Sequence, residues 1–148
     1  MLPPNKGCPQ QALSTRHPWA YLIAAGDKDI ENRTWRTEFR GRIWIHASRA
    51  FDREFPFKRP CSTEEIEHEV FSRAARFVSE RPDFSGAIIG EVDIVDCVTR
   101  HESPWFEGPY GFVLEGAVLY DKPIRSRGQL KFYVPSMASV NGGEWRLL

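Results

Sequence analysis

Apolar residues near the N-terminus recur at the spacing of a short helix. Four of them fall on one helical face: Trp19, Leu22, Ile23 and Gly26. Ser14 or Thr15 is a candidate N-cap, Pro18 suits the first turn, and glycine at the end of the stripe is a common helix stop. This pattern predicts a first helix that ends near Gly26.

Alternating apolar and polar positions predict five strands. They cover residues 30–35, 42–48, 86–98, 110–120 and 131–134. Because side chains alternate across a strand, Glu31, Arg33 and Trp35 should share one face of the first of these strands. In the second, Ile43, Ile45 and Ala47 should face a core, opposite Trp44, His46 and Ser48.

A second helix is expected after a loop over residues 49–61. Residues 62–65 read Ser-Thr-Glu-Glu, which resembles a capping box. An apolar stripe follows at Ile66, Val70, Ala74 and Phe77. We expect residues 1–12 to be a flexible lead-in, residues 13–135 to form one domain, and residues 136–148 to be a loosely held tail.

The predicted elements define an α+β protein with about five to six strands and two main helices. The strands outnumber the helices, and their connections are not regular βαβ crossovers. A small closed or nearly closed β-barrel with the helices packed outside it fits this order best.

Composition narrows the class of protein. With 148 residues, 41% hydrophobic and 27% charged, the chain is long enough to fold as one domain without staples. No run is apolar enough to span a bilayer, and residues 1–6 lack the apolar core of a signal peptide. The three cysteines are far apart and form no C-x-x-C, so we predict no metal site, no cofactor and a cytoplasmic location.

Charge is distributed unevenly although the net charge is zero. Residues 28–49 hold six basic and three acidic side chains, and residues 121–131 hold four basic side chains against Asp121 alone. Such runs are commonly solvated faces. The alternative is one basic side built from both segments.

The strongest chemical signal is G-x-K-x-x-E-x-R, formed by Gly26, Lys28, Glu31 and Arg33. A cation in a cleft can hold a phosphate or a developing oxyanion, and a carboxylate beside it can accept from a base edge or act as a general base. The plain alternative is a salt-bridged surface turn, since Lys28 and Glu31 are three residues apart. An exposed pair of that kind contributes only ~0.2–1 kcal/mol.

Several motifs in this order give the chain its family likeness. They are Ser14-x-x-x-Pro18-Trp19-Ala20, the G-x-K-x-x-E-x-R motif, Arg40-Gly41, Ile45-His46-Ala47-Ser48 and Gly90-Glu91-Val92. From about Ala12 to Pro135 the chain resembles an ASCH domain, a branch of the PUA-like β-barrel superfamily. The resemblance implies a PUA-like barrel with a cleft beside the first helix, lined by the motif.

The resemblance also implies a function. ASCH domains generally bind RNA or other nucleic acids, and related YTH and EVE domains hold a modified base in an aromatic pocket. We therefore expect RNA, another single-stranded nucleic acid or a modified nucleoside as partner, and no obligate protein partner. The expected binding residues are Trp19, Lys28, Glu31, Arg33, Trp35, Arg36, Arg40, His46 and Ser48. Trp105, in a Ser-Pro-Trp-Phe loop, is a candidate exposed aromatic that closes over a ligand.

Two alternatives remain open at this stage. The first is a hydrolase, acting on N4-acetylcytidine or as a ribonuclease, with Glu31 as general base and Lys28 as electrostatic stabiliser. The amidohydrolase subgroup of the family has G-x-K-x-x-T-x-R, so Glu31 stands where that subgroup has its threonine nucleophile. The second alternative is a protein-interaction domain.

Overall fold

The structure is a computed structural model that describes residues 8–52, 66, 68–135, 137–140 and 144–147. Its elements, in chain order, are β1 (Ala12–His17), α1 (Trp19–Ala24), β2 (Ile30–Arg33), β3 (Gly41–Phe51), α2 (His68–Glu80), η2 (Pro82–Phe84), β4 (Ala87–Val98), β5 (Tyr110–Arg125), β6 (Phe132–Tyr133), β7 (Met137–Val140) and β8 (Glu144–Leu147).

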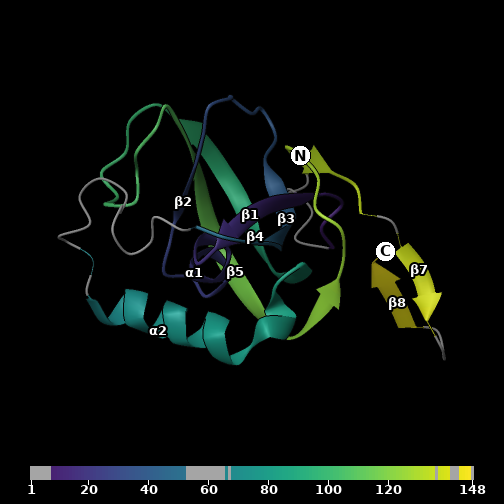
Figure 1. Ribbon diagram of the computed structural model, residues 1–148. Coiled ribbons are helices and arrows are strands. Elements are labelled where there is room, and N and C mark those ends of the chain that lie inside the picture. The colour runs from purple at the N-terminus through teal and green to yellow at the C-terminus, as the bar shows by residue number, and fades with distance from the viewer. Residues whose placement is uncertain (1–7, 53–65, 67, 136, 141–143, 148) are drawn as a thin grey trace.

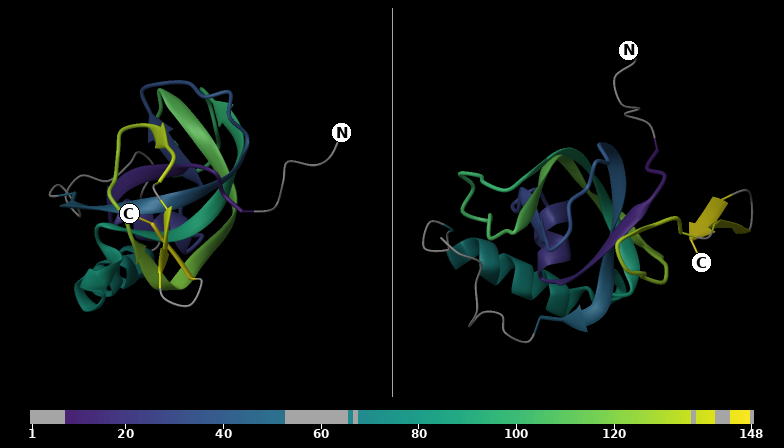
Figure 2. Two further views of the ribbon diagram at one scale, coloured as in Figure 1. Left: turned by 90° about the vertical axis from the view of Figure 1, so that its right-hand side faces the viewer. Right: turned by 90° about the horizontal axis from the view of Figure 1, so that it is seen from above.

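Six strands form one curled, mixed sheet in the order β2-β5-β4-β3-β1-β6 (Figure 1). Only the β1–β3 pair is parallel. β2 and β6 are the two edges, and they do not hydrogen-bond to one another, so the barrel-like sheet is not closed. β7 and β8 pair separately, as a hairpin beside the six-stranded sheet (Figure 2). The predicted α+β, barrel-like fold is confirmed, with an open seam.

The core lies on the concave side of the sheet. Ile43, Ile45 and Ala47 are fully buried there, as their alternation along β3 predicted. α1 has only six residues, too few for an isolated helix, and it is stabilised because nearly all of it is buried between the sheet and α2. Phe77 of α2 stacks on Tyr21 of α1, with ring centroids 4.3 Å apart.

One glycine allows this close packing. A Cβ at Gly90 of β4 would lie 2.2 Å from the carbonyl oxygen of Val118 and 3.0 Å from Cβ of Ala24 in α1. No side chain fits that space, so Gly90 is where β4, β5 and α1 make their closest approach.

The start of the chain departs from the sequence prediction. Ser14 and Thr15 do not cap a helix, because Ala12–His17 is a strand paired in parallel with β3. The helix begins only at Trp19, after Pro18, and no side chain caps it. The error arises because the partner of β1 is about 30 residues away in the sequence, where local periodicity gives no signal.

The remaining elements follow the predictions closely. β4 and β5 match their expected ranges, although β5 continues to Arg125, and the last expected strand is reduced to Phe132–Tyr133. The expected stripe on α2 packs against α1 as Val70, Ala74 and Phe77. The capping box at residues 62–65 lies outside the described residues. No helix in the described part of the chain is long and apolar enough to cross a membrane.

Candidate nucleic-acid interface

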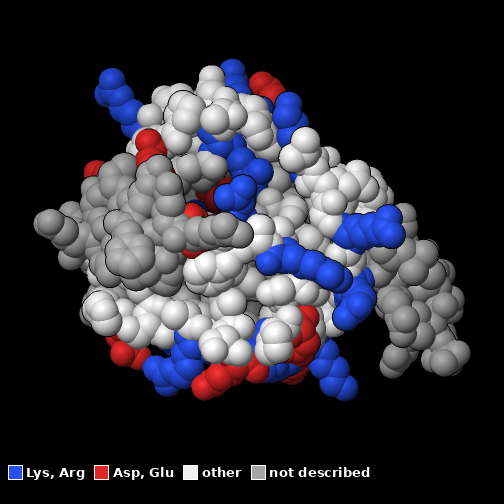
Figure 3. All heavy atoms as spheres, viewed as in Figure 1, with Lys and Arg blue, Asp and Glu red and all other residues white. Residues whose placement is uncertain are grey.

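A cavity of about 730 Å³ opens at the seam where the sheet fails to close. Its walls come from β1, the start of α1, the segment through β2 to Trp35, and two loops that contribute Glu107, Gly108 and Leu130. On the face shown in Figure 3, acidic atoms lie in a hollow beside Lys and Arg side chains. Three of the strand and helix positions that the sequence singled out, Trp19, Lys28 and Arg33, therefore meet in one place.

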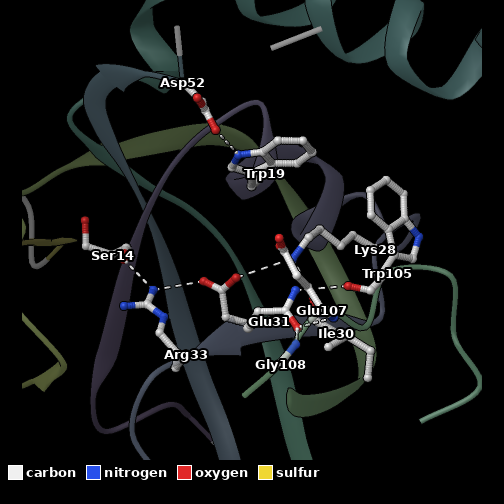
Figure 4. Close-up of polar contacts among 11 residues, drawn as sticks. Ser14, Trp19, Lys28, Ile30, Glu31, Arg33, Asp52, Trp105, Glu107 and Gly108 are labelled. Carbon is white, nitrogen blue, oxygen red and sulfur yellow. Dashed lines mark hydrogen bonds and ion pairs between the residues drawn. The ribbon is translucent and has the colours of Figure 1, made fainter. Parts of the chain in front are cut away.

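A buried charge triad forms the floor of this cavity (Figure 4). Nζ of Lys28 lies 3.3 Å from Oε1 of Glu31, and a guanidinium nitrogen of Arg33 lies 2.9 Å from Oε2 of the same carboxylate. The side chains are 4%, 7% and 20% exposed in the order Lys28, Glu31, Arg33. Two cations around one carboxylate leave one positive charge at the floor.

Backbone carbonyls fix the two cations. Lys28 donates to the carbonyl of Ile30. Arg33 donates to the carbonyl of Ser14, 2.9 Å away on β1, so this guanidinium bridges the open seam between β2 and β1. The triad is therefore rigidly placed by both sides of the barrel opening, which rules out the plain surface-turn alternative for Lys28 and Glu31.

The triad sets the protonation of its members. Burial lowers the pKa of Lys28, and Glu31 opposes that shift. Burial alone would raise the pKa of Glu31, but the charges of Lys28 and Arg33 and their hydrogen bonds hold it below its ordinary value. Glu31 is thus a carboxylate of low basicity, suited to accepting hydrogen bonds and poorly suited to accepting a proton.

Two tryptophans form opposite walls. Trp19 donates through its indole nitrogen to a carboxylate oxygen of Asp52, 2.9 Å away. Trp35 packs edge-on against Phe112 and Phe132 of the core, at centroid distances of 5.1 and 5.3 Å, and the rest of its half-buried ring lines the cavity. Both rings are held by contacts that leave them beside the charge triad.

Trp105 does not close over the cavity, so the expectation of an exposed aromatic there is wrong. Its side chain is 4% exposed and packs against Trp19 and Phe71. Asn32 explains this placement. Its side chain donates to the carbonyl of Trp105 and accepts from the amides of Glu107 and Gly108, at 3.0, 2.8 and 3.0 Å.

Four predicted binding residues lie outside the cavity lining. Arg36 is exposed and pairs with Glu38. Arg40 donates to the carbonyls of Thr37 and Phe39, and the hydroxyl of Ser48 donates to the carbonyl of Ala50. Strand parity brought Trp35 to the cavity with Glu31 and Arg33, but the turn after β2 carries the two arginines away from it.

His46, the fourth, is buried behind β1. Its Nε2 lies 2.8 Å from the carbonyl of Ser126, which can only accept, so Nε2 carries the proton. Nδ1 then accepts from the hydroxyl of Ser14, also 2.8 Å away. Burial lowers the pKa of His46, which keeps the ring neutral. His46 therefore links β3, β1 and the loop at Ser126.

Two buried histidines predict acid sensitivity. Burial also lowers the pKa of His17, whose Nε2 donates to the carbonyl of Phe84. Because unfolding restores both to about 6.5, the unfolded chain binds more protons just below that pH. We expect the free energy of unfolding in urea to be highest above pH ~6.5 and to fall as the pH drops toward the folded-state pKa values.

Single substitutions check the source of this pH dependence. We expect His17→Gln to flatten the fall in stability between neutral and mildly acidic pH, since the titrating group is gone. His68→Gln, at an exposed position on α2, should leave the slope as in the wild type. A slope unchanged in the His17 variant would contradict the assignment.

Sequence reasoning missed several residues of the cavity. Asn32 lies between two motif residues, but its role depends on a loop more than 70 residues away. Ser14 was taken for a helix cap, and Asp52 and Leu130 carry no local signal. The only available hint was the basic composition of residues 121–131, which ends beside Leu130.

The geometry agrees with what comparison with known proteins finds. The ASCH domain family matches residues 13–133, so the chain belongs to the ASCH family. It is also similar to Activating signal cointegrator 1 from Mus musculus, 36% identical over 95 residues, and from Homo sapiens, 35% identical over 95 residues. These matches cover 61% of this chain and about 15% of the length of each relative.

Proposed function

We propose that this ASCH domain binds RNA, with one nucleotide entering the seam cavity. The observation that carries the proposal is the buried Lys28–Glu31–Arg33 triad, set between Trp19 and Trp35 with one net positive charge. ASCH domains are generally RNA-binding modules, and the cavity offers a charge for phosphate, a carboxylate for a base edge and an aromatic wall for stacking.

Each group has a role in this proposal. Both hydrogen bonds that Arg33 donates within the described part of the chain come from one of its terminal nitrogens, so its other N–H groups are directed to the ligand. Those donors suit a phosphate. Glu31 accepts from a base amino group, and the base stacks on Trp35, a contact of ~1–3 kcal/mol.

Recognition is better supported than hydrolysis. A general base needs a pKa close to the working pH, whereas Lys28 and Arg33 lower the pKa of Glu31. The position of the threonine nucleophile of the amidohydrolase subgroup is also occupied by Glu31 itself. For these reasons we assign Glu31 to ligand recognition.

Fluorescence anisotropy with a labelled, mixed-sequence single-stranded RNA tests the proposal. We expect the affinity to fall as salt is raised, because phosphate contacts release counterions. Arg33→Ala should weaken binding by ~10–100-fold, the value of one or two charge-assisted hydrogen bonds, and should leave Lys28 paired with Glu31.

The matched control is Arg76→Ala, an exposed arginine on α2 that does not line the cavity. It removes the same charge and should bind nearly as well as the wild type. If RNA does not bind, or if the two variants lose affinity equally, the proposed site is wrong.

A further inference from the structure

A basic loop borders the cavity at its outer rim. Residues 126–131 connect β5 to β6 and carry Arg127, Leu130 and Lys131. Leu130 lines the cavity and is 93% exposed. Nζ of Lys131 lies 5.4 Å above the ring of Trp35, on the cavity wall. The two basic segments of the sequence, residues 28–49 and 121–131, therefore meet at this point.

The loop is anchored to the body of the barrel. His46 holds the carbonyl of Ser126, and the same ring is bonded to Ser14 on β1. Gly128 packs so closely over this pair that a Cβ there would lie 2.8 Å from both Oγ of Ser14 and Cε1 of His46. After Lys131 the chain pairs with β1 as β6. The rim is thus built in a defined position beside the seam.

Lys131 itself has an unusual backbone. Its φ of 57° lies in the left-handed region, and no other non-glycine residue in the described part of the chain has a positive φ. A residue other than glycine in that region is sparsely populated, and such positions cluster at ligand clamps. Here the conformation places a cation over the aromatic wall of the cavity.

We propose that this loop binds the nucleotides that flank the one in the cavity, so that the ligand is a single-stranded polynucleotide and not a free nucleoside. The inference rests on the proposed function and adds the class of ligand. Arg127 and Lys131 contact neighbouring phosphates, and Leu130 packs against the next base. Charge favours this occupant, because residues 121–131 hold four basic side chains and one acidic side chain.

Competition experiments test the inference. Ribonucleoside monophosphates and single-stranded RNAs of two, four and eight nucleotides would compete with the labelled RNA for the wild type and for an Arg127→Ala, Lys131→Ala double variant. We expect affinity to rise with length up to about four nucleotides, near the lower end of known single-strand site sizes. The double variant should bind the longer RNAs roughly tenfold more weakly at low salt, with a shallower salt dependence by about 0.7 per lost phosphate contact.

The matched control is an Arg76→Ala, Arg100→Ala double variant. It removes two exposed arginines that do not line the cavity and gives the same change in net charge. It should retain the wild-type length dependence, and the loop variant should bind monophosphates as the wild type does.

Two outcomes overturn the inference while the proposed function survives. One is that monophosphates compete as well as octanucleotides, and the other is that the loop variant and the control behave alike although Arg33→Ala abolishes binding. Absence of binding by every RNA and monophosphate would instead refute the proposed function and this inference with it. Capture of a protein on the loop with no RNA contact would have the same effect.

Discussion

Replacement of Glu31 by alanine should lower the free energy of unfolding by ~3–5 kcal/mol, because it leaves two cations side by side in a buried site. In the wild type the carboxylate is shared by Lys28 and Arg33 at 3.3 and 2.9 Å, and Lys28 is almost fully buried. Urea unfolding followed by circular dichroism measures the loss. The loss should be largest at neutral pH and should shrink as the pH rises and Lys28 releases its proton.

The direction of that pH effect follows from linkage. Burial already lowers the pKa of Lys28, and removal of its anionic partner lowers it further. The unfolded chain then binds more protons than the folded variant at pH values below about 10.5, so stability rises with pH.

Glu38→Ala is the matched control for the Glu31 variant. Glu38 also pairs with an arginine, Arg36, but its side chain is 86% exposed. Exposed pairs contribute little, so the change should stay within ~0.5 kcal/mol. If both variants lost the same small amount of stability, the triad would not be the tightly coupled floor that the structure shows.

Gly90→Ala should have the second large effect, a loss of about 3 kcal/mol or failure to fold, because the added methyl group has no space. The carbonyl of Val118 would lie 2.2 Å from the new Cβ. A backbone atom of the central β4–β5 pair cannot move aside as a flexible side chain can. Thermal and urea unfolding of the purified variant give the measurement.

Gly26→Ala separates this steric effect from a conformational one. Gly26 has a φ of +87°, but the nearest atom to an added Cβ is 4.0 Å away, so its replacement strains only the backbone. That should cost about 1 kcal/mol. Equal losses in the two variants would show that Gly90 is not a point of close contact.

The sequence predicted most strands because they are amphipathic. Ile43, Ile45 and Ala47 alternate with polar positions, and this local pattern depends only on which face is buried. β1 could not be found in that way, since its identity as a strand depends on a parallel pairing with β3. Its apolar residues Ala12 and Leu13 are adjacent, so neither strand nor helix periodicity marks them.

The same division applies to the site. Lys28, Glu31 and Arg33 were predicted because they stand close together in one motif, and the structure joins them in one triad. Asn32 and Leu130 owe their places at the cavity to contacts between distant segments. His46 was singled out by a family motif, yet it lies one layer behind the cavity, where it supports Ser14 and the rim loop.

The most direct test of the central claim is a titration of isotope-labelled protein with single-stranded RNA, followed by two-dimensional NMR. The account predicts shifts at the indole N–H groups of Trp19 and Trp35 and at the guanidinium of Arg33, with α2 residues such as Arg76 unaffected. Shifts confined to α2, or no shifts at RNA concentrations that saturate the anisotropy signal, would contradict the claim that RNA enters the seam cavity.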